Sequence, residues 1–203
     1  EYSRLFSLVF ESYVTELVAG TGLPHITEDT YKQLLGKDAH AVEAILDAEE
    51  CNVLIEAKMS LFADDVLIQD DETRIYEKTK NIRNGIKQGW HVGRSLREHH
   101  ALKDRFTKPQ DFLLIVTSRD LLIGGGEMLE RLYSKGRLNY PADDPTAPDR
   151  LPLRNIFIMC IEDFERFIAN LKLGTIDLKT FLEKAATDNQ FINSGRLYLS
   201  EFL

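Results

Sequence analysis

Apolar residues recur at helical spacing along much of the chain. Near the start, Leu5, Val9 and Tyr13 follow one another every fourth residue, which predicts an amphipathic helix over residues 5–18. At residues 27–36, Thr27 is placed to cap a short helix and Gly36 to end it. The same kind of pattern predicts further helices over residues 72–98, 127–136, 163–174 and 177–189.

Short apolar runs rich in β-branched and aromatic residues lie between these helices. Residues 41–46 and 51–60 flank a short polar turn and predict a β-hairpin. Residues 111–120 and 154–163 are apolar throughout their centres, which favours buried parallel strands. The order of elements therefore predicts an α/β fold in which helices flank a mixed central sheet.

The size of the chain fits one domain. It has 203 residues, of which 43% are apolar, enough for a sizeable core. We expect a single domain over residues 1–203, with a core at about 5–120 and a C-terminal strand and helices at about 150–190. The chain begins with Glu1 inside a helical pattern, so we expect it to be a piece of a longer, multidomain protein.

The predicted hairpin brings charged residues together. A four-residue turn at 48–51 pairs Asp47 with Asn52, and the same register places Glu43 opposite Glu56. Lys58 follows Glu56 by two residues, so both side chains leave the same face of the strand. The hairpin thus predicts two carboxylates and one ammonium group at the same place.

A divalent metal ion accounts for this grouping. Opposed carboxylates repel one another in a sheet, and burying them without partners costs more. Two carboxylates and a main-chain carbonyl are ligands that Mg²⁺ prefers, with waters completing the octahedron. A lysine beside such an ion orients or deprotonates a water molecule, while the metal stabilises charge on a phosphoryl oxygen.

Glu43 on one strand and Glu56-Ala57-Lys58 on the next resemble the motif of the PD-(D/E)xK, or restriction-endonuclease-like, nuclease superfamily. The resemblance covers roughly residues 5–116 and implies a restriction-endonuclease-like core. It implies that Glu43, Glu56 and the backbone carbonyl of Ala57 bind Mg²⁺, or Mn²⁺, and that Lys58 positions the attacking water.

The resemblance extends to the flanking helices. That family often has a further glutamate in its first helix, where this chain has Glu11, and polar or basic residues in the helix after the motif, where it has Lys87 and Gln88. The first acid of the family is usually Asp. Asp38 and Asp47 therefore stay open as alternatives to Glu43.

Charge is distributed unevenly along the chain. The net charge is −8, which argues against binding nucleic acid with the whole surface. Residues 74–108, however, contain ten Lys and Arg against three acids, a local charge of +7. In the predicted helix over 72–98, four cations fall within about 60° of one another. We expect this flank to contact a phosphate backbone through Lys80, Arg83, Lys87 and Arg94.

These patterns predict a Mg²⁺-dependent endonuclease that acts on DNA. The alternatives are an RNA-directed nuclease, and an inactive domain of the same fold that serves nucleic-acid binding or assembly. The resemblance also fits effector domains of bacterial defence proteins, whose partners are other domains or subunits, and a homo-oligomer is compatible with it. We expect a cytoplasmic location, because the chain has no run of about 18 apolar residues and Cys51 and Cys160 lie in apolar, core-like runs.

Overall fold

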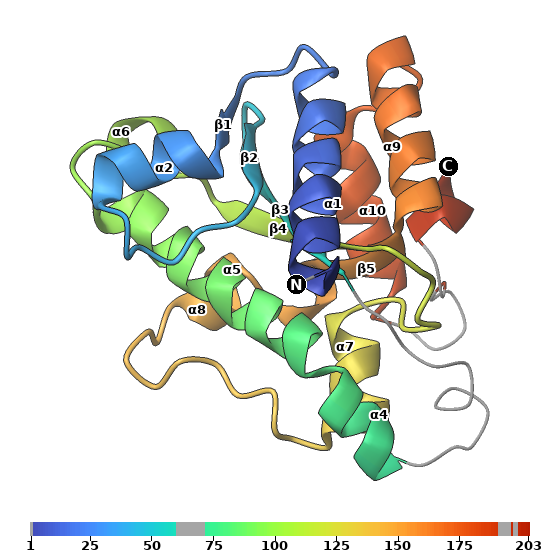
Figure 1. Ribbon diagram of the computed structural model, residues 1–203. Helices are drawn as coiled ribbons and strands as arrows, with labels where there is room; N and C mark the ends of the chain where they lie inside the picture. Colours follow the sequence, from blue (N-terminus) through green and yellow to red (C-terminus); the bar gives the residue numbers. More distant parts are fainter. Residues whose placement is uncertain (1, 60–71, 191–195, 197–198) are drawn as a thin grey trace.

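The protein is built on one five-stranded sheet with strand order β1-β2-β3-β4-β5 (Figure 1). The structure is a computed structural model and describes residues 2–59, 72–190, 196 and 199–203. The strands are β1 (His25–Thr27), β2 (Ala44–Asp47), β3 (Cys51–Lys58), β4 (Gln110–Thr117) and β5 (Ile156–Cys160). β1, β2 and β3 pair antiparallel, whereas β3, β4 and β5 pair parallel. The predicted α/β fold with a mixed, helix-flanked sheet is confirmed.

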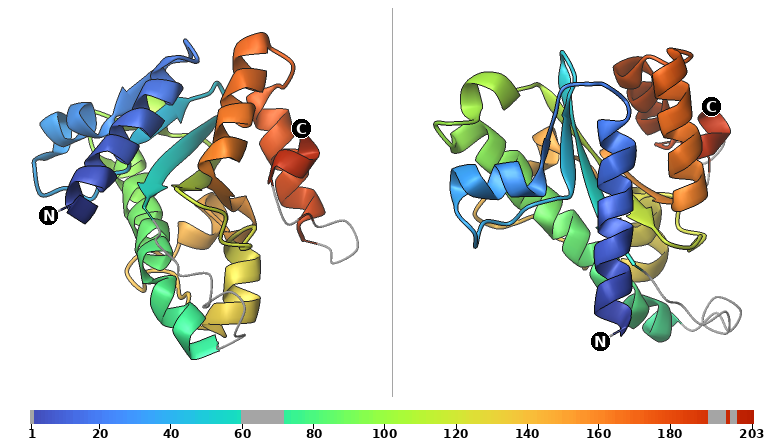
Figure 2. Two further views of the ribbon diagram at one scale, coloured as in Figure 1. Left: turned by 45° about the vertical axis from the view of Figure 1, so that its right-hand side comes forward. Right: turned by 45° about the horizontal axis from the view of Figure 1, so that its top comes forward.

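Helices cover both faces of the sheet (Figure 2). One face packs against α5 and the short elements near it, and the other against α1, α9 and α10. The longer helices are α1 (Tyr2–Ala19), α2 (Glu28–Leu35), α4 (Glu72–Lys78), α5 (Lys80–Glu98), α9 (Ile161–Leu173) and α10 (Leu178–Asp188). The short helical segments are α6 (Lys103–Phe106), α7 (Gly126–Met128), η1 (Leu129–Ser134), α8 (Ala147–Arg150), η2 (Leu153–Asn155) and η3 (Leu199–Phe202). Two apolar clusters, one on each face, form the core.

The ends of α2 are fixed by the residues that the sequence pattern singles out. The side chain of Thr27 accepts a hydrogen bond from the backbone N–H of Thr30, which satisfies one free donor of the first turn. Gly36 ends the helix with φ 108°, a left-handed region that favours glycine. Both predictions are confirmed.

The predicted helix over 72–98 is divided at Thr79 into α4 and α5. Thr79 N donates to Ile75 O at 2.9 Å, which closes α4, and Thr79 O accepts from Arg83 N at 3.0 Å, which opens α5. Thr79 itself has φ −78° and ψ 5°, outside helical geometry, and the carbonyl of Tyr76 accepts hydrogen bonds from the side chains of Thr79, at 3.0 Å, and Arg83. α4 and α5 are therefore two separate helices.

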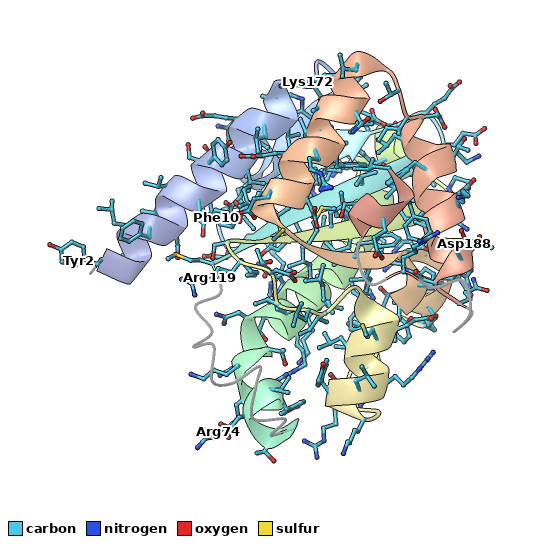
Figure 3. The ribbon with its side chains drawn as sticks, turned by 90° about the vertical axis from the view of Figure 1, so that its right-hand side faces the viewer. Tyr2, Phe10, Arg74, Arg119, Lys172 and Asp188 are labelled. Atoms are coloured by element: carbon cyan, nitrogen blue, oxygen red, sulfur yellow. The ribbon has the colours of Figure 1, made fainter. Side chains whose placement is uncertain are left out.

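Helix α1 packs with its second half and projects with its first. Val14 and Val18 are fully buried against the sheet, whereas Leu5 and Val9 are each 60% exposed. Figure 3 shows the reason: from Tyr2 to about Phe10 the helix extends beyond the body of the molecule. Of the apolar residues of this helix, only those that overlie the sheet belong to the core.

The hairpin register agrees with the prediction. Asp47 pairs with Asn52, and Ala44 pairs with Ile55 as the last partners of β2 and β3. The pairing of β3 with β4 continues further, to Lys58 opposite Thr117. The last three residues of β3 therefore lie past the end of β2. The edge strand β1, which the sequence pattern did not predict, extends the sheet on the other side of β2.

No helix in the described part of the chain combines the length and the apolar character needed to cross a membrane. Both cysteines are free thiols, Cys51 buried and Cys160 half-buried. The segment between β3 and α4, which includes Asp64 and Asp65, lies outside the described residues.

Candidate active site

Glu56 is the most deeply buried acid of the predicted site. It alternates with Leu54 and Lys58 on the face of β3 that packs against α5, and only 1% of its surface is exposed. The Lys58 ammonium donates a hydrogen bond to Glu56 Oε1. Oε2, equally buried, has no hydrogen-bond partner among the described residues. A buried carboxylate that is only half satisfied is costly, so this oxygen calls for a functional explanation.

Gly85 of α5 lies directly over this pair. A Cβ atom at this position would stand 3.3 Å from Glu56 Cγ and 3.4 Å from Lys58 Cε. The glycine lets the helix backbone approach the two side chains as closely as the packing allows. The helix thereby shields one side of Glu56 from water.

Glu43 lies where the register requires it, next to Glu56. It is the residue before β2, and continuation of the Ala44–Ile55 pairing places it opposite Glu56. Its backbone carbonyl accepts a hydrogen bond from Glu28 N at 3.0 Å. Two residues earlier, the carbonyl of Ala41 accepts one from Gln88 Nε2 of α5 at 3.2 Å. The segment that carries Glu43 is therefore fixed to both α2 and α5.

Burial raises the pKa values of both carboxyl groups toward neutral pH. Burial raises the pKa of Glu43 to about 8, and the negative charges of Glu56, Glu11 and Glu28 add to the rise, while Lys58 opposes it. Burial also raises the pKa of Glu56 to about 7, with Lys58 opposing. Both groups are thus poised to lose a proton near neutral pH when a positive charge arrives.

Glu11 belongs to the same site. It lines an open groove of about 340 Å³ between α1 and α2 together with Glu43. Five carboxylates face this groove: Glu11, Glu16, Glu28, Asp29 and Glu43. Glu11 and Glu43 thus share one groove although they are distant in sequence, and the role of Glu11 at a metal ion stays a prediction.

The two alternative first acids lie elsewhere. Asp47 is at the far end of β2 from Glu43 and forms ion pairs with Arg105 at 2.6 Å and Lys108 at 3.4 Å. Asp38 is exposed in the loop after α2. Of the three candidates, Glu43 is the one that adjoins the last hairpin pair, Ala44 with Ile55, and so lies nearest Glu56 along the two strands.

Two of the predicted phosphate-binding cations are engaged within the protein. Arg83 is 8% exposed, donates to Thr79 Oγ1 at 2.6 Å and to Tyr76 O, and lies 3.6 Å above the Tyr76 ring. Arg94 forms ion pairs with Glu98 at 3.0 Å and Asp143 at 2.8 Å.

The predicted cationic flank faces away from the carboxylates. Lys80 and Lys87 are exposed, but at 100° per residue the four cations lie about 140–200° around the helix from Gly85. Gln88 lies only about 60° from Gly85, in keeping with its bond to Ala41. Gln88 therefore binds the segment that leads to Glu43, whereas Lys80, Arg83, Lys87 and Arg94 lie on the other side of α5.

Sequence reasoning missed two residues of the site, Glu28 and Gly85. Glu28 acts through its charge on Glu43, and its place depends on the unpredicted strand β1. Gly85 carried a visible signal, because Gly85, Gly89 and Gly93 recur every four residues in a helix, where glycine is unfavourable.

Within the described ranges, no three or more His, Cys, Asp or Glu side chains are grouped so as to hold a metal ion. A site made of two carboxylates, one main-chain carbonyl and waters has fewer acidic ligands than that. The half-satisfied Glu56 and the raised pKa values of both carboxyl groups fit a cation at this position. No protein-family model, curated protein or solved structure was found to match the chain.

Proposed function

We propose that this protein is a metal-dependent nuclease that hydrolyses phosphodiester bonds, with DNA as the expected substrate. The observation that carries the proposal is Glu56: a buried carboxylate with one free oxygen, bonded to Lys58 and in register with Glu43. Structural ion pairs satisfy both partners, whereas this pair leaves an acceptor available.

Glu43, Glu56 and the main-chain carbonyl of Ala57 would hold Mg²⁺ or Mn²⁺, and Glu11 stands near enough in the groove to add negative charge. When bound, the ion supplies Lewis-acid stabilisation of charge on a phosphoryl oxygen. The residues themselves have separate roles. Lys58 orients a water molecule beside the scissile phosphate, and Gly85 and the apolar residues around it limit other water.

The topology supports a restriction-endonuclease-like core. The sequence of elements is a helix, a hairpin with Glu43 directly before one strand and Glu56 on the other, a helix and a further parallel strand, as the PD-(D/E)xK resemblance implies. The last three residues of β3, Glu56 to Lys58, extend past β2, which leaves this edge accessible. Glu43 in place of Asp is the departure from that pattern.

The test is cleavage of supercoiled plasmid with Mg²⁺ or Mn²⁺, alongside EDTA. We expect nicking or linearisation that Lys58→Ala and Glu56→Gln each reduce by at least about a hundredfold, because each change removes a group at the reacting atoms. Lys87→Ala serves as the control on the opposite side of α5. Equal cleavage by wild type and by the two site variants would refute the proposal.

An inactive domain of the same fold is the second candidate, favoured by Glu43 in place of the usual Asp. Calorimetric titration separates the two, since the nuclease requires Mg²⁺ or Mn²⁺ binding at millimolar concentration or tighter. A labelled RNA in the cleavage assay separates RNA from DNA. A role as effector domain of a defence protein stays a prediction.

A further inference from the structure

The projecting half of α1 exposes a row of large apolar side chains, as Figure 3 shows for the part from Tyr2 to about Phe10. Five residues, each between 40% and 82% exposed, form this row: Tyr2, Leu5, Phe6, Val9 and Tyr13. Single exposed apolar residues are ordinary on a protein surface, but a contiguous patch of them indicates an interaction surface.

The row has the spacing of a contact between two helices. Tyr2, Phe6, Val9 and Tyr13 follow one another at intervals of four, three and four residues. At 100° per residue they lie within about 60° of one another, with Leu5 about 40° to one side. Apolar residues at alternating intervals of three and four form the seam of coiled coils, which is narrower than the stripe of a helix that packs on a globular core. The row therefore fits a second helix.

The side of α1 that packs on its own molecule points elsewhere. Val14 is fully buried, and the Ser7 hydroxyl donates to Met59 Sδ at 3.7 Å. Both residues lie about 110–130° around the helix from the middle of the row. At the end of the row, the Tyr13 hydroxyl donates to Glu165 of α9. The row is therefore turned away from the sheet, and α9 of the same molecule reaches its end.

The charges near the row argue against a polyanion or an anionic membrane as its partner. The two charged residues within the span 2–13 are Arg4 and Glu11, and they lie about 170–190° from the middle of the row. Further along α1, five carboxylates face the groove between α1 and α2. Nucleic acid and anionic lipid both require cations beside the apolar contact, and this groove repels them. The partner is therefore an apolar protein surface.

A second copy of the same row provides such a surface. Intervals of four, three and four read the same in both directions, so two rows can interlock about a two-fold axis. At about 150–200 Å² for each fully exposed large side chain, the row exposes about 450–600 Å². Two copies would bury about 900–1,200 Å² of apolar surface, which together with a polar rim reaches the roughly 1,200–2,000 Å² of a stable interface.

We propose that two copies of this chain associate through the exposed row of α1 and form a two-fold homodimer. The proposal rests on the exposure and spacing of the row and on the charges around it, and it is independent of the proposed nuclease function.

Val9 and Leu8 give a matched pair of variants. They are neighbours on α1 and are 60% and 54% exposed, but Leu8 lies about 100° from Val9 and outside the row. Glutamate is a good helix former, so Val9→Glu and Leu8→Glu add the same charge to an intact helix. Sedimentation velocity is measured for both variants and the wild type at concentrations up to about 100 μM. Equal melting temperatures show that both variants fold.

We expect the wild type to sediment as a dimer, at twice the 23.3 kDa mass of the chain. Val9→Glu should raise the dimer dissociation constant at least about a hundredfold, because it places two like charges inside the apolar contact. Leu8→Glu should stay within about threefold of wild type.

A wild type that stays monomeric at about 100 μM would overturn the proposal, and so would equal weakening by the two variants. Flotation with phosphatidylcholine vesicles, with and without an anionic lipid, is run alongside. A monomer that floats with the vesicles would also overturn the proposal, because the occupant of the row would then be a membrane surface.

Discussion

The parallel pair β3–β4 has a buried carboxylate at each end, and the two differ in how many hydrogen bonds they accept. At the start of β4, Asp111 accepts hydrogen bonds from Arg97 Nη1 at 2.7 Å, from Arg97 Nη2 at 3.0 Å and from Asn52 Nδ2 at 2.7 Å. Near the end of β3, Glu56 has the single donor Lys58 and one oxygen without a partner. Both side chains face α5.

The difference separates a structural charge from a functional one. Both oxygens of Asp111 accept hydrogen bonds, in a bidentate arginine contact that is the strongest geometry for a carboxylate, and Asn155 Nδ2 donates to its backbone carbonyl at 3.0 Å. Burial raises the pKa of Asp111, and the hydrogen bonds and charge of Arg97 oppose this rise. Glu56 is kept partly uncompensated inside the same sheet, at a cost in stability that a purely structural residue would not justify. The contrast leads to three predictions, in order of decreasing effect.

The largest effect is expected at the structural end. Asp111→Ala leaves the Arg97 guanidinium without its buried partner and should lower the free energy of unfolding by about 3–5 kcal/mol. Urea unfolding followed by circular dichroism measures it, with the exposed Asp104→Ala as a control expected within about 0.5 kcal/mol of wild type. A loss of unfolding free energy in Asp111→Ala as small as that of Asp104→Ala would contradict a structural role for Asp111.

At the functional end, Glu56→Gln should stabilise the protein at pH 8 in EDTA. The pKa of Glu56 is about 7 in the folded protein, against about 4.3 for an unfolded glutamate, so folding favours its protonated form. The wild type therefore loses stability as pH rises from about 4.5 to 7, and the variant avoids a loss of about 3–4 kcal/mol.

The measurement is urea unfolding of both proteins from pH 4 to 8. The two curves should converge at the acid end and separate above about pH 5. Adding Mg²⁺ at pH 8 should stabilise the wild type and leave Glu56→Gln nearly unchanged, because the ion binds the folded, ionised site. A variant less stable than wild type at pH 8 would mean that Glu56 is a structural ion-pair partner.

The two glycines of α5 over these carboxylates sharpen the contrast. A Cβ at Gly93 would stand 2.6 Å from Asp111 Oδ2, whereas one at Gly85 would be 3.3 Å from Glu56 Cγ. Gly93→Ala should therefore destabilise by about 1–3 kcal/mol. Gly85→Ala should change stability by less than about 1 kcal/mol, since helix propensity offsets the crowding, but reduce plasmid cleavage. The opposite order of stabilities would contradict the contrast.

Much of the fold follows from local sequence patterns. The strands at 51–58 and 110–117, the cap at Thr27 and the hairpin register all depend on near neighbours, and the structure agrees with them. Register is robust here because a slip by one residue would turn Leu54 and its apolar neighbours to the wrong face.

What could not be predicted depends on contacts between distant residues. From the sequence, Arg94 is a candidate for binding a ligand. In the structure it forms an ion pair with Asp143, which is 49 residues away in the sequence. Arg83 likewise looks like a ligand-binding cation in the sequence. Its burial depends on packing against Tyr76 of α4, which the sequence pattern does not show. Helical angles grouped the cations on one flank of the helix but could not show which flank faces β3. In the structure, the flank of Gly85 faces β3, because Gly85 lies over Glu56 and Lys58.

The glycine row of α5 has a mechanical consequence for the whole molecule. Gly85, Gly89 and Gly93 repeat every four residues, so a slide of the helix by four residues, about 6 Å, would replace one glycine by the next at the first two contacts. At the third contact the slide would bring Arg97 to the place of Gly93, onto Asp111, and would break their hydrogen bonds. The Arg97–Asp111 hydrogen bonds therefore favour one of the two positions that the glycine spacing allows for α5. They act about three turns from Gly85 and keep it next to Glu56.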